Sequence, residues 1–463
     1  MAISNQWNMS EHPVLKLGTL CIMYIAQGIT HGFLFIALVD YLTQQEVKDE
    51  LIAGITAFAV LPWAFKWVWG PIIDRFTYLP MGRRRPWLIF AQFMMVVTMA
   101  TILFLGDITT QIKPLMWLFF IHNVFKSLQD VSVDALAVDI LKEEERGFAN
   151  GLMYGFSYAG SFIGMDLNFV IIRTNFTMAI WIILILLILI MAIPLLLRER
   201  AGEKLLPWTK GQPVLKKGHD VVGSTWDLLV SFLKAFSVRS ALFAAVTAVM
   251  IYIACNILGP LNSLINTKIL GFSSDFFTTL GIVGTLGAML GSFSGGYIAD
   301  KLGHKRTIII TLLVLGGVWI GGSFLMPLWS NKIYAITTTT IVGALIGFMG
   351  ASFFSIAMDV SWKKIGGSQF ACYMALMNVS YTIALRSSTH VRDFAANLGN
   401  SDLFQSTLGS MERFSNSELL PYGIMMMFMG LWSLLVIVPI IFIDPHQTSR
   451  VLGDGLPETE TQQ

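Results

Sequence analysis

Long apolar runs restrict the possible folds of this chain more than any other feature of its sequence. A bilayer core about 30 Å thick needs roughly 20 apolar residues in each helix that crosses it. Since 55% of the 463 residues are hydrophobic and only 13% are charged, the composition excludes an ordinary soluble domain. We predict an all-α membrane protein with twelve transmembrane helices, at residues 16–40, 51–73, 86–106, 114–140, 148–172, 176–197, 239–264, 275–298, 306–328, 333–359, 368–390 and 420–443.

Lysine and arginine residues predict which helix ends face the cytoplasm. If the N-terminus is inside, 21 of the 31 basic residues lie on the cytoplasmic side, seven lie outside and three lie within helices. Cytoplasmic loops carry the excess of Lys and Arg in membrane proteins, so both termini are predicted to be cytoplasmic. Residues 1–13 are polar and contain no short apolar stretch ending in small residues, so we expect no cleavable signal peptide. The net charge of +2 gives no indication of nucleic-acid binding, because topology accounts for the positive residues.

Two similar loops divide the chain into halves. Residues 70–85 read GPIIDRFTYLPMGRRR, and residues 296–306 read GYIADKLGHKR. In each, an Asp follows a Gly by four positions at the end of a predicted helix, and the two Asp residues are 226 positions apart. Internal repeats of this kind are typical of transporters built from two related bundles. We predict six-helix bundles at residues 1–197 and 239–444, a cytoplasmic linker at 198–238 and a cytoplasmic tail at 445–463.

The linker contains the segment STWDLLVSFLKAF at residues 224–236. Its helix start signal and apolar stripe predict an amphipathic helix on the membrane surface. An ordinary solvated connector is the alternative.

Twelve spans in two halves, with these loops after the second helix of each half, resemble the major facilitator superfamily. The second loop is close to that family's pattern, whereas the first contains the insert FTYLPM. The stretches LPWAFKWVWGPIIDRF (61–76), GRRRPWLIFAQ (82–92) and SLQDVSVDALAVDILKEEERGFANG (127–151) are similar to the muropeptide permease (AmpG) and acetyl-coenzyme A transporter branch. This closer resemblance rests on residues 60–165, and the second half departs from it more.

The two loop motifs predict contacts between the halves at their cytoplasmic ends. A carboxylate beside a glycine can approach the positive end of a neighbouring helix. We expect Asp74 to face the start of span eleven, near Gly367 and Ser368. By the repeat symmetry, Asp300 is expected to face the start of span five, near Gly147. Breaking these contacts would open the cytoplasmic side.

The family resemblance adds Arg83 and Asp139 as partners in a charge relay that closes the outward-facing state. The neighbouring arginines also fit a purely topological role, and both roles are compatible. The predicted gating residues are Gly70, Asp74, Arg83, Asp139, Gly296, Asp300 and Lys305.

The run at residues 114–140 contains ionisable residues at four-residue spacing, namely His122, Lys126, Asp130 and Asp134. Ionised side chains at the centre of a bilayer span cost about 2.5–3.5 kcal/mol each, so they normally face a cavity or a partner. Residues four apart stay on one broad face of a helix. By its depth, Lys66 in the second span can pair with either acid, and Lys126 is the alternative partner.

These five residues predict proton coupling through Asp130 or Asp134, with Lys126, Lys66 and His122 beside them. Burial and a nearby ammonium act on a carboxyl in opposite directions, so one acid could titrate as its partner moves. The alternative is a fixed ion-pair network that holds spans two and four together. His122 is also explained by a hydrogen-bonded contact between helices.

Polar side chains interrupt several spans that would line a central cavity. They offer hydrogen-bond donors and acceptors to a substrate rich in hydroxyl, amide or carboxylate groups. The predicted substrate-binding residues are Gln27, His31, Asn123, Gln129, Tyr154, Tyr158, Asn256, Asn378, Tyr381 and Arg386.

The sequence has no ATP-binding loop, metal-ligand spacing or nucleophile constellation. We therefore expect no enzymatic activity, no cofactor and no metal, and an ion gradient as the energy source. Cys21, Cys255 and Cys372 fall in three different spans, so they predict neither a disulfide framework nor a metal site.

Together these features predict a monomeric secondary transporter of the bacterial inner membrane. It would work by alternating access and import a bulky polar solute with protons. The resemblance implies anhydro-muropeptides or acetyl-coenzyme A as substrates. A siderophore importer on the same fold, an exporter and a non-transporting membrane sensor stay open as alternatives. The expected partners are a small polar substrate, protons and the lipid bilayer, without nucleic acid.

Overall fold

The computed structural model describes residues 7–215, 222–406 and 418–453, and these ranges contain helices but no β-strand. Ten helical segments within them are long and apolar enough to cross a membrane. Two further helices, α6 (Ile112–Ile140) and α15 (Gly366–Gly399), have the length of a span but are more polar. The all-α membrane fold is confirmed, whereas the count of twelve spans stays a prediction. Linker residues 216–221 and tail residues 454–463 lie outside the described ranges.

The N-terminal half runs from α1 to α8. Its helices are α1 (Pro13–Gly32), α2 (Leu38–Gln44), α3 (Asp49–Ala64), α4 (Trp69–Arg75), α5 (Arg85–Ile102), α6, α7 (Arg146–Arg173) and α8 (Phe176–Leu196). A linker helix, α9 (Thr225–Ser237), follows before the second half begins.

The C-terminal half runs from α10 to α18. Its helices are α10 (Arg239–Met250), α11 (Ile253–Asn256), α12 (Ser274–Leu302), α13 (His304–Phe324), α14 (Lys332–Asp359), α15, α16 (Asp402–Phe404), α17 (Leu420–Ile441) and α18 (Gln447–Leu452).

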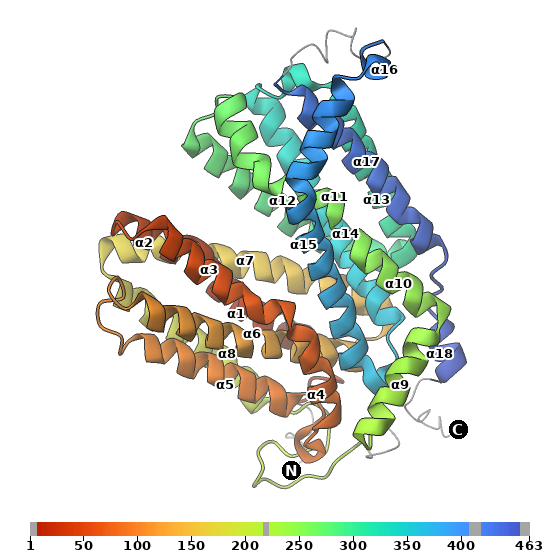
Figure 1. Ribbon diagram of the computed structural model, residues 1–463. Coiled ribbons are helices and arrows are strands. Elements are labelled where there is room, and N and C mark those ends of the chain that lie inside the picture. The colour runs from red at the N-terminus through yellow and green to blue at the C-terminus, as the bar shows by residue number, and fades with distance from the viewer. Residues whose placement is uncertain (1–6, 216–221, 407–417, 454–463) are drawn as a thin grey trace.

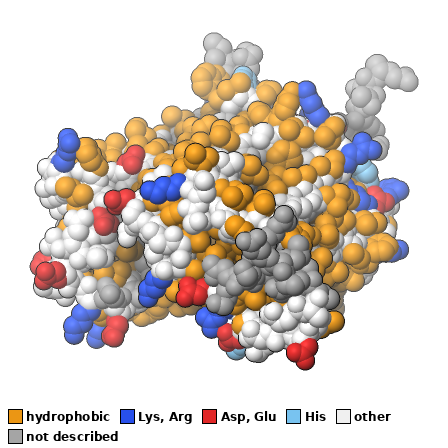
Figure 2. Space-filling model, turned by 90° about the horizontal axis from the view of Figure 1, so that it is seen from above, with side chains coloured by type: hydrophobic (Ala, Val, Ile, Leu, Met, Phe, Trp, Pro, Cys, Tyr) orange, Lys and Arg blue, Asp and Glu red, His pale blue; other side chains and the backbone are white. Residues whose placement is uncertain are grey.

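The two halves form separate helical bundles that meet at one end and diverge toward the other (Figure 1). They meet near α4, α9 and α15, and they diverge toward α2 and α16. We call the end that carries residues 76–84 and α9 the closed end, and the opposite end the open end. Hydrophobic side chains cover much of the face in Figure 2, and charged side chains gather toward its edges, as expected for a surface that faces lipid.

Three spans depart from a regular α-helix. A π-helical segment, Phe33–Ala37, separates α1 from α2. The predicted spans 51–73 and 239–264 match the candidate spans Glu50–Arg75 and Arg239–Leu261, and each of these consists of several helical segments. A 3-10 helix, Lys66–Val68, interrupts the second span between α3 and α4, and it begins four residues after Pro62.

The seventh span breaks after α10, where Tyr252 N–H donates to the Ser380 hydroxyl at 3.0 Å. Pro260 lies in the following 3-10 helix, Gly259–Leu261, and has no backbone N–H to continue an α-helix. Irregular backbone at membrane depth needs a partner or a cavity. Both broken spans border the central cavity described below.

Glycines allow several helix pairs to cross with their backbones almost in contact. A Cβ atom on Gly164 of α7 would lie 2.0 Å from the Ile29 carbonyl oxygen of α1, and one on Gly291 of α12 would lie 1.9 Å from the Ala344 carbonyl oxygen. Small residues permit such close packing in membranes, where water supplies no hydrophobic driving force between helices. Packing within each half thus accounts for these glycines.

The linker helix α9 lies at the closed end, with Ser224 as its N-cap. The Ser224 side chain accepts a hydrogen bond from Asp227 N–H at 3.0 Å. Leu228 and Ala235 pack in a small cluster with Ile365, a residue of the second half. Trp226 remains 73% exposed on the other face, which fits a helix that lies along a membrane surface.

We expect Gly164→Val to lower the apparent unfolding temperature of the purified protein by a few degrees. The added side chain meets the α1 backbone, and overpacking costs about 1–3 kcal/mol. Gly317→Val is the matched control, because a Cβ at Gly317 meets nothing within 4 Å. Equal thermal unfolding curves for the two variants would contradict the close-crossing interpretation.

Candidate functional site

The break in the second span places Lys66 inside the protein. Lys66 opens the short 3-10 helix, is 6% exposed, and donates to the Asp130 carboxylate of α6 at 3.0 Å. The sequence prediction that Lys66 pairs with one of the two α6 acids thus holds for Asp130. The break also leaves the Trp63 carbonyl oxygen available to a donor from the opposite half, Asn378, at 3.3 Å.

The second acid of α6 has a different partner. Asp134 accepts a hydrogen bond from the Tyr24 hydroxyl at 2.5 Å. Within the part of the chain that the structure describes, no basic side chain forms an ion pair with Asp134. Asp130 and Asp134 are therefore distinct: one carboxylate is neutralised by a lysine, and the other is held by a phenol.

Lys126 lies one helical turn from Asp130 toward the open end. Its ammonium nitrogen is 5.6 Å from the centroid of the Trp63 ring, and the residue is 2% exposed. A cation–π contact contributes about 0.5–2 kcal/mol, whereas an ionised side chain at the centre of a span costs about 2.5–3.5 kcal/mol or more. The contact with Trp63 therefore compensates the buried charge incompletely.

Three further polar residues of α6 contact their own half rather than the cavity. The His122 ring lies 3.0 Å from the Thr98 hydroxyl of α5. Asn123 accepts from the Trp63 indole N–H at 3.2 Å, and Gln129 accepts from the Gln27 side chain at 2.7 Å. These residues hold helices of the N-terminal half together, and the structure does not bring His122 to the two acids.

A central cavity of about 430 Å³ lies between the halves. Eight of the predicted site residues line it, namely Gln27, Lys66, Asp130, Tyr154, Tyr158, Asn256, Asn378 and Tyr381. Further lining residues that the sequence did not single out are Tyr24, Trp63, Ser157, Tyr252, Cys255, Ile346, Phe354, Met374 and Met377. The wall thus combines aromatic rings with a few hydroxyl and amide groups, a lining typical of small-molecule sites.

Besides Asn123 and Gln129, two more of the predicted substrate-binding residues lie away from this lining. His31 is exposed, and its ring packs against Phe35 at 4.6 Å. Arg386 is exposed on α15, five residues beyond Tyr381 toward the open end. Neither belongs to the residues that enclose the cavity.

Aromatic contacts close the cavity toward the closed end. The Tyr154 ring stacks on Phe354 of the opposite half, with centroids 4.0 Å apart and planes 5° apart. Its other neighbour is the Tyr24 ring, 5.3 Å away in an edge arrangement. Tyr154 therefore connects the residue that binds Asp134 to a helix of the other half.

The Asp74 carboxylate joins the halves at the closed end. It accepts hydrogen bonds from the Ser368 backbone N–H and hydroxyl, both at 2.7 Å, and it is fully buried. Ser368 lies in the first turn of α15, where backbone N–H groups lack intrahelical partners and the helix dipole is positive. The expected contact with the start of span eleven is present.

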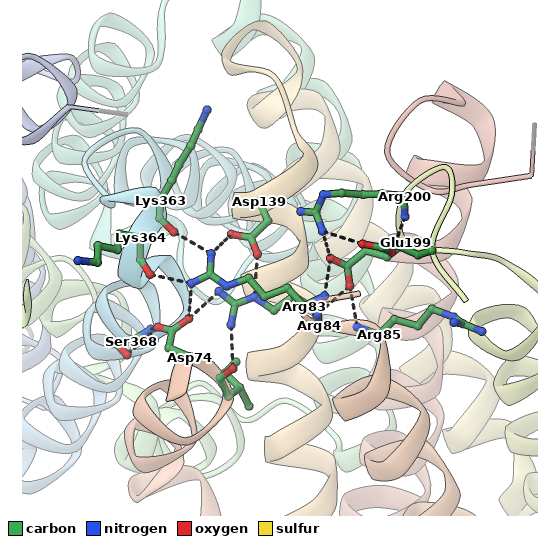
Figure 3. A network of polar contacts seen from close by, with 12 residues as sticks. Asp74, Arg83, Arg84, Arg85, Asp139, Glu199, Arg200, Lys363, Lys364 and Ser368 are labelled. Atoms are coloured by element: carbon green, nitrogen blue, oxygen red, sulfur yellow. Dashed lines mark hydrogen bonds and ion pairs between the residues drawn. The ribbon is translucent and has the colours of Figure 1, made fainter. Parts of the chain in front are cut away.

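Arg83 and Arg84 bridge Asp74 and Asp139 (Figure 3). Arg83 also donates to the Lys363 and Lys364 carbonyl oxygens of the second half, at 3.0 and 2.7 Å. The Arg84 guanidinium lies 2.6 Å from Asp74 and 2.8 Å from Asp139. The resemblance named Arg83 and Asp139, and the structure adds Arg84 as an equal member of this network.

Glu199, in the linker, holds the backbone of the three arginines. Its carboxylate accepts from the backbone N–H groups of Arg83, Arg84 and Arg85 at 3.0, 2.7 and 2.9 Å, as Figure 3 shows. Arg85 in turn donates to carbonyl oxygens at the end of α8, including that of Pro194 at 2.6 Å. The sequence analysis missed Glu199, because no spacing relates it to the loop.

The repeat-related contact involves Asp300 and the start of α7. Its carboxylate accepts from Gly147 N–H at 2.7 Å and from Phe148 N–H at 2.6 Å, so the expected contact is present. Next to this contact lies a charged cluster that the sequence analysis missed. The His304 ring nitrogens lie 3.0 Å from the Asp300 carboxylate and 2.6 Å from the Asp359 carboxylate. The fourth member of the cluster is Arg146 of the N-terminal half, which forms an ion pair with Asp359 of the C-terminal half at 2.7 Å.

The other predicted gating residues have simpler places. A Cβ on Gly70 would lie 2.6 Å from the Ser368 Cα, and one on Gly296 would lie 2.1 Å from the Gly147 carbonyl oxygen. Lys305 donates to the Ile441 and Ile443 carbonyl oxygens of its own half, so it caps α17 rather than joining the halves.

Linker acids complete the electrostatics of the closed end. Burial, together with the charge of Glu199, raises the pKa of Glu203 to about 8. Burial opposes ionisation of Asp227, but its hydrogen bond to Lys364 at 2.9 Å and the lysine charge lower the pKa of this carboxyl. The α9 helix is therefore tied by charge to the second half. No metal-binding group of three or more His, Cys, Asp or Glu occurs in the described ranges.

Comparisons with known proteins agree with this architecture. A family model described as Major Facilitator Superfamily matches residues 20–385. The anhydromuropeptide permease of Escherichia coli (strain K12) is 25% identical over 372 residues, which cover 78% of this chain and 71% of the permease. The putative transporter AmpG 4 of Rickettsia felis is 22% identical over 376 residues, covering 77% of this chain and 85% of the relative.

Solved structures show the same fold at low identity. A bacterial homologue of the iron transporter ferroportin in an outward-facing state has a TM-score of 0.63 at 14% identity, over 92% of this chain and 98% of the other. The proton:xylose symporter XylE has a TM-score of 0.61 at 14% identity, over 92% and 95% of the two chains.

We expect Asp74→Asn to separate the halves at the closed end. Removing one partner of a buried ion pair costs about 3–5 kcal/mol, because the other charges stay buried and less compensated. Double electron–electron resonance measures the distance between spin labels attached at positions Tyr78 and Leu302, one in each half. The variant should show a larger population of long distances between these labels than the wild type does. Asp107→Asn is the control, since Asp107 is exposed and accepts from Thr109 in its own loop. Unchanged distances in the Asp74 variant would contradict a gating role.

Proposed function

The chain belongs to the Major Facilitator Superfamily, and from this premise we propose that it carries a bulky polar solute across the membrane by alternating access. Membership of this family makes it a multi-pass membrane transporter and not an enzyme. The observation that carries the proposal is a cavity between two halves, on whose closed side lie the ion pairs that join the halves within the described ranges.

The contacts between the halves are arranged for such a motion. Glycines 147 and 151 of α7 cross α12 near Gly296 and Ser292, whereas Gly160 and Gly164 contact α1 of their own half. Contacts between α7 and the second half thus belong to the closed-end part of the helix. We take residues 1–197 and 239–444 as the moving units, residues 198–238 as the linker and residues 445–463 as a tail.

The closed end is proposed to face the cytoplasm. Its loops carry the arginines of residues 83–85, the linker and Lys363–Lys364, and cytoplasmic loops are rich in such residues. Both termini would then be cytoplasmic. The bacterial relatives favour an inner membrane location, and a monomer suffices for the cavity.

The proposed substrate is an anhydromuropeptide or a solute of similar size and polarity. The relative of this name covers 78% of the chain, and the cavity walls supply the aromatic rings and amides that a sugar-containing solute needs. Entry from the open side, and release after the closed end separates, would make the protein an importer. The predicted substrate residues on the cavity wall would bind this solute.

Proteoliposomes that contain the purified protein should accumulate radiolabelled anhydromuropeptide. Tyr154→Ala should reduce uptake about tenfold, equivalent to about 1.4 kcal/mol of lost interaction, because it removes the ring that closes the cavity. Phe104→Ala, which changes an 86% exposed side chain outside the cavity, should transport normally. No uptake by the wild type, with the protein folded and correctly inserted, would disprove the proposed substrate.

We further propose that Asp134 carries the coupled proton, while Lys66 and Asp130 remain an ion pair beside it. A buried carboxyl without a counter-ion is the better proton carrier of the two. Tyr24 binds Asp134, contacts Tyr154, and through it reaches Phe354 of the second half. Protonation at Asp134 can therefore influence how the halves pack around the cavity. Lys126 and His122 stay in the neighbourhood of the pair without a direct part in this step.

Asp134→Asn should abolish accumulation driven by an imposed proton gradient but keep exchange of labelled for unlabelled solute. Exchange needs no net proton movement, so it reports whether the variant still binds and moves substrate. Asp166→Asn, an exposed acid of the same half, is the control. If the Asp134→Asn variant still accumulates solute in response to the proton gradient, Asp134 is not the residue that carries the coupled proton.

A further inference from the structure

The buried ammonium of Lys126 has no acidic partner among the described residues. Asp130, the nearest acid on the same helix, is engaged with Lys66 at 3.0 Å, and Asp134 accepts from Tyr24. Two lysines and two acids therefore do not form the closed neutral network that their number suggests. Lys126 is left with the Trp63 ring, 5.6 Å from its nitrogen.

Lys126 lies next to the wall of the central cavity, although it is 2% exposed and is not one of the lining residues. Lys126 precedes Asp130 by one turn of α6, about 6 Å along the helix axis. Trp63 and Asp130 both line the central cavity, and the Lys126 ammonium lies beside the Trp63 ring. The Trp63 indole therefore has to turn before a solute in the cavity can reach this ammonium.

The position of this ammonium is fixed by contacts from both halves. The Trp63 indole N–H donates to Asn123 at 3.2 Å, and the Trp63 carbonyl accepts from Asn378 of the second half at 3.3 Å. The indole that Lys126 contacts is thus held in one orientation while the cavity is closed below. When the halves move, Asn378 moves with the second half, so the binding of a ligand here is linked to the conformation.

We propose that Lys126, beside the face of Trp63, binds the anionic group of the transported solute, so that the substrates of this protein are carboxylates or other organic anions. An anion would neutralise a buried cation that the protein compensates only in part, and the indole would pack against the apolar part next to that group. This inference rests on the proposed function, since it concerns the same cavity. It moves Lys126 from the proton-coupling group to substrate recognition.

Binding of matched acids and amides to the purified protein tests the proposal. The probes are N-acetylmuramate, benzoate, hexanoate and a carboxylate-containing anhydromuropeptide, each paired with its primary amide and measured by calorimetry. Wild-type protein should bind at least one acid about tenfold more tightly than its amide, the strength of a hydrogen bond to a charged group. Lys126→Gln should lose this preference while binding the amide unchanged, which also shows that the variant is folded.

Two control variants make the result specific. Lys126→Arg should keep the preference, because the positive charge remains. Lys113→Gln, an exposed lysine in the first turn of the same helix, should behave as the wild type does. Lys126→Gln that retains the full preference would overturn the inference, as would a wild type that binds no acid of the panel more tightly than its amide.

The proposed function and this inference can fail separately. If anhydromuropeptide is transported but its acid and amide forms are taken up equally, the substrate assignment stands and the role of Lys126 is wrong. If anhydromuropeptide is not transported but another acid of the panel shows the Lys126-dependent preference, the proposed substrate is wrong and the anion site stands.

Discussion

The buried carboxylate of Asp74 is the contact on which the closed state depends most. It accepts two hydrogen bonds from Ser368 at the start of α15, and two arginines of its own half neutralise it. The accepting carboxylate belongs to the N-terminal half, and the donating groups of Ser368 belong to the C-terminal half. These hydrogen bonds can therefore form only when the two halves are in contact at this end. The Tyr154–Phe354 stack, which closes the cavity, lies on the same side of the cavity as this contact.

In two spans, the helix is irregular where a side chain of α15 forms a hydrogen bond with the backbone. The break before Lys66 exposes the Trp63 carbonyl, and Asn378 binds it. The break after α10 turns Tyr252 N–H toward the Ser380 hydroxyl. In a bilayer, an unpaired peptide group has no water to turn to. The irregular backbone of spans two and seven therefore ties cavity geometry to side chains on α15, which is common to both contacts.

Much of this architecture follows from the sequence, and the misses have two physical causes. Apolar length and the two glycine–aspartate loops are enough to predict the bundles and the contacts of Asp74 and Asp300. Depth along a helix is also readable, which is why the Lys66–Asp130 pair could be anticipated. The rotation of a helix is much harder to read, so His122 faces α5 rather than the acids. Glu199 lies 116 residues from Arg83, and only the fold brings them together.

The role of Glu199 has a consequence for the biogenesis of the protein. The three arginines are fixed through their backbone by a residue that follows the sixth span, so the ribosome makes the loop long before its anchor. Domains form from the N-terminus during synthesis at about 5–20 residues per second. The interval of 116 residues therefore leaves the arginine loop without its anchor for at least about 6 seconds after it is synthesised. During that time the positive charges of the loop can keep the loop on the cytoplasmic side of the membrane and so set the orientation of the first helices. The same arginines join the contacts of the closed end only once the first bundle is complete.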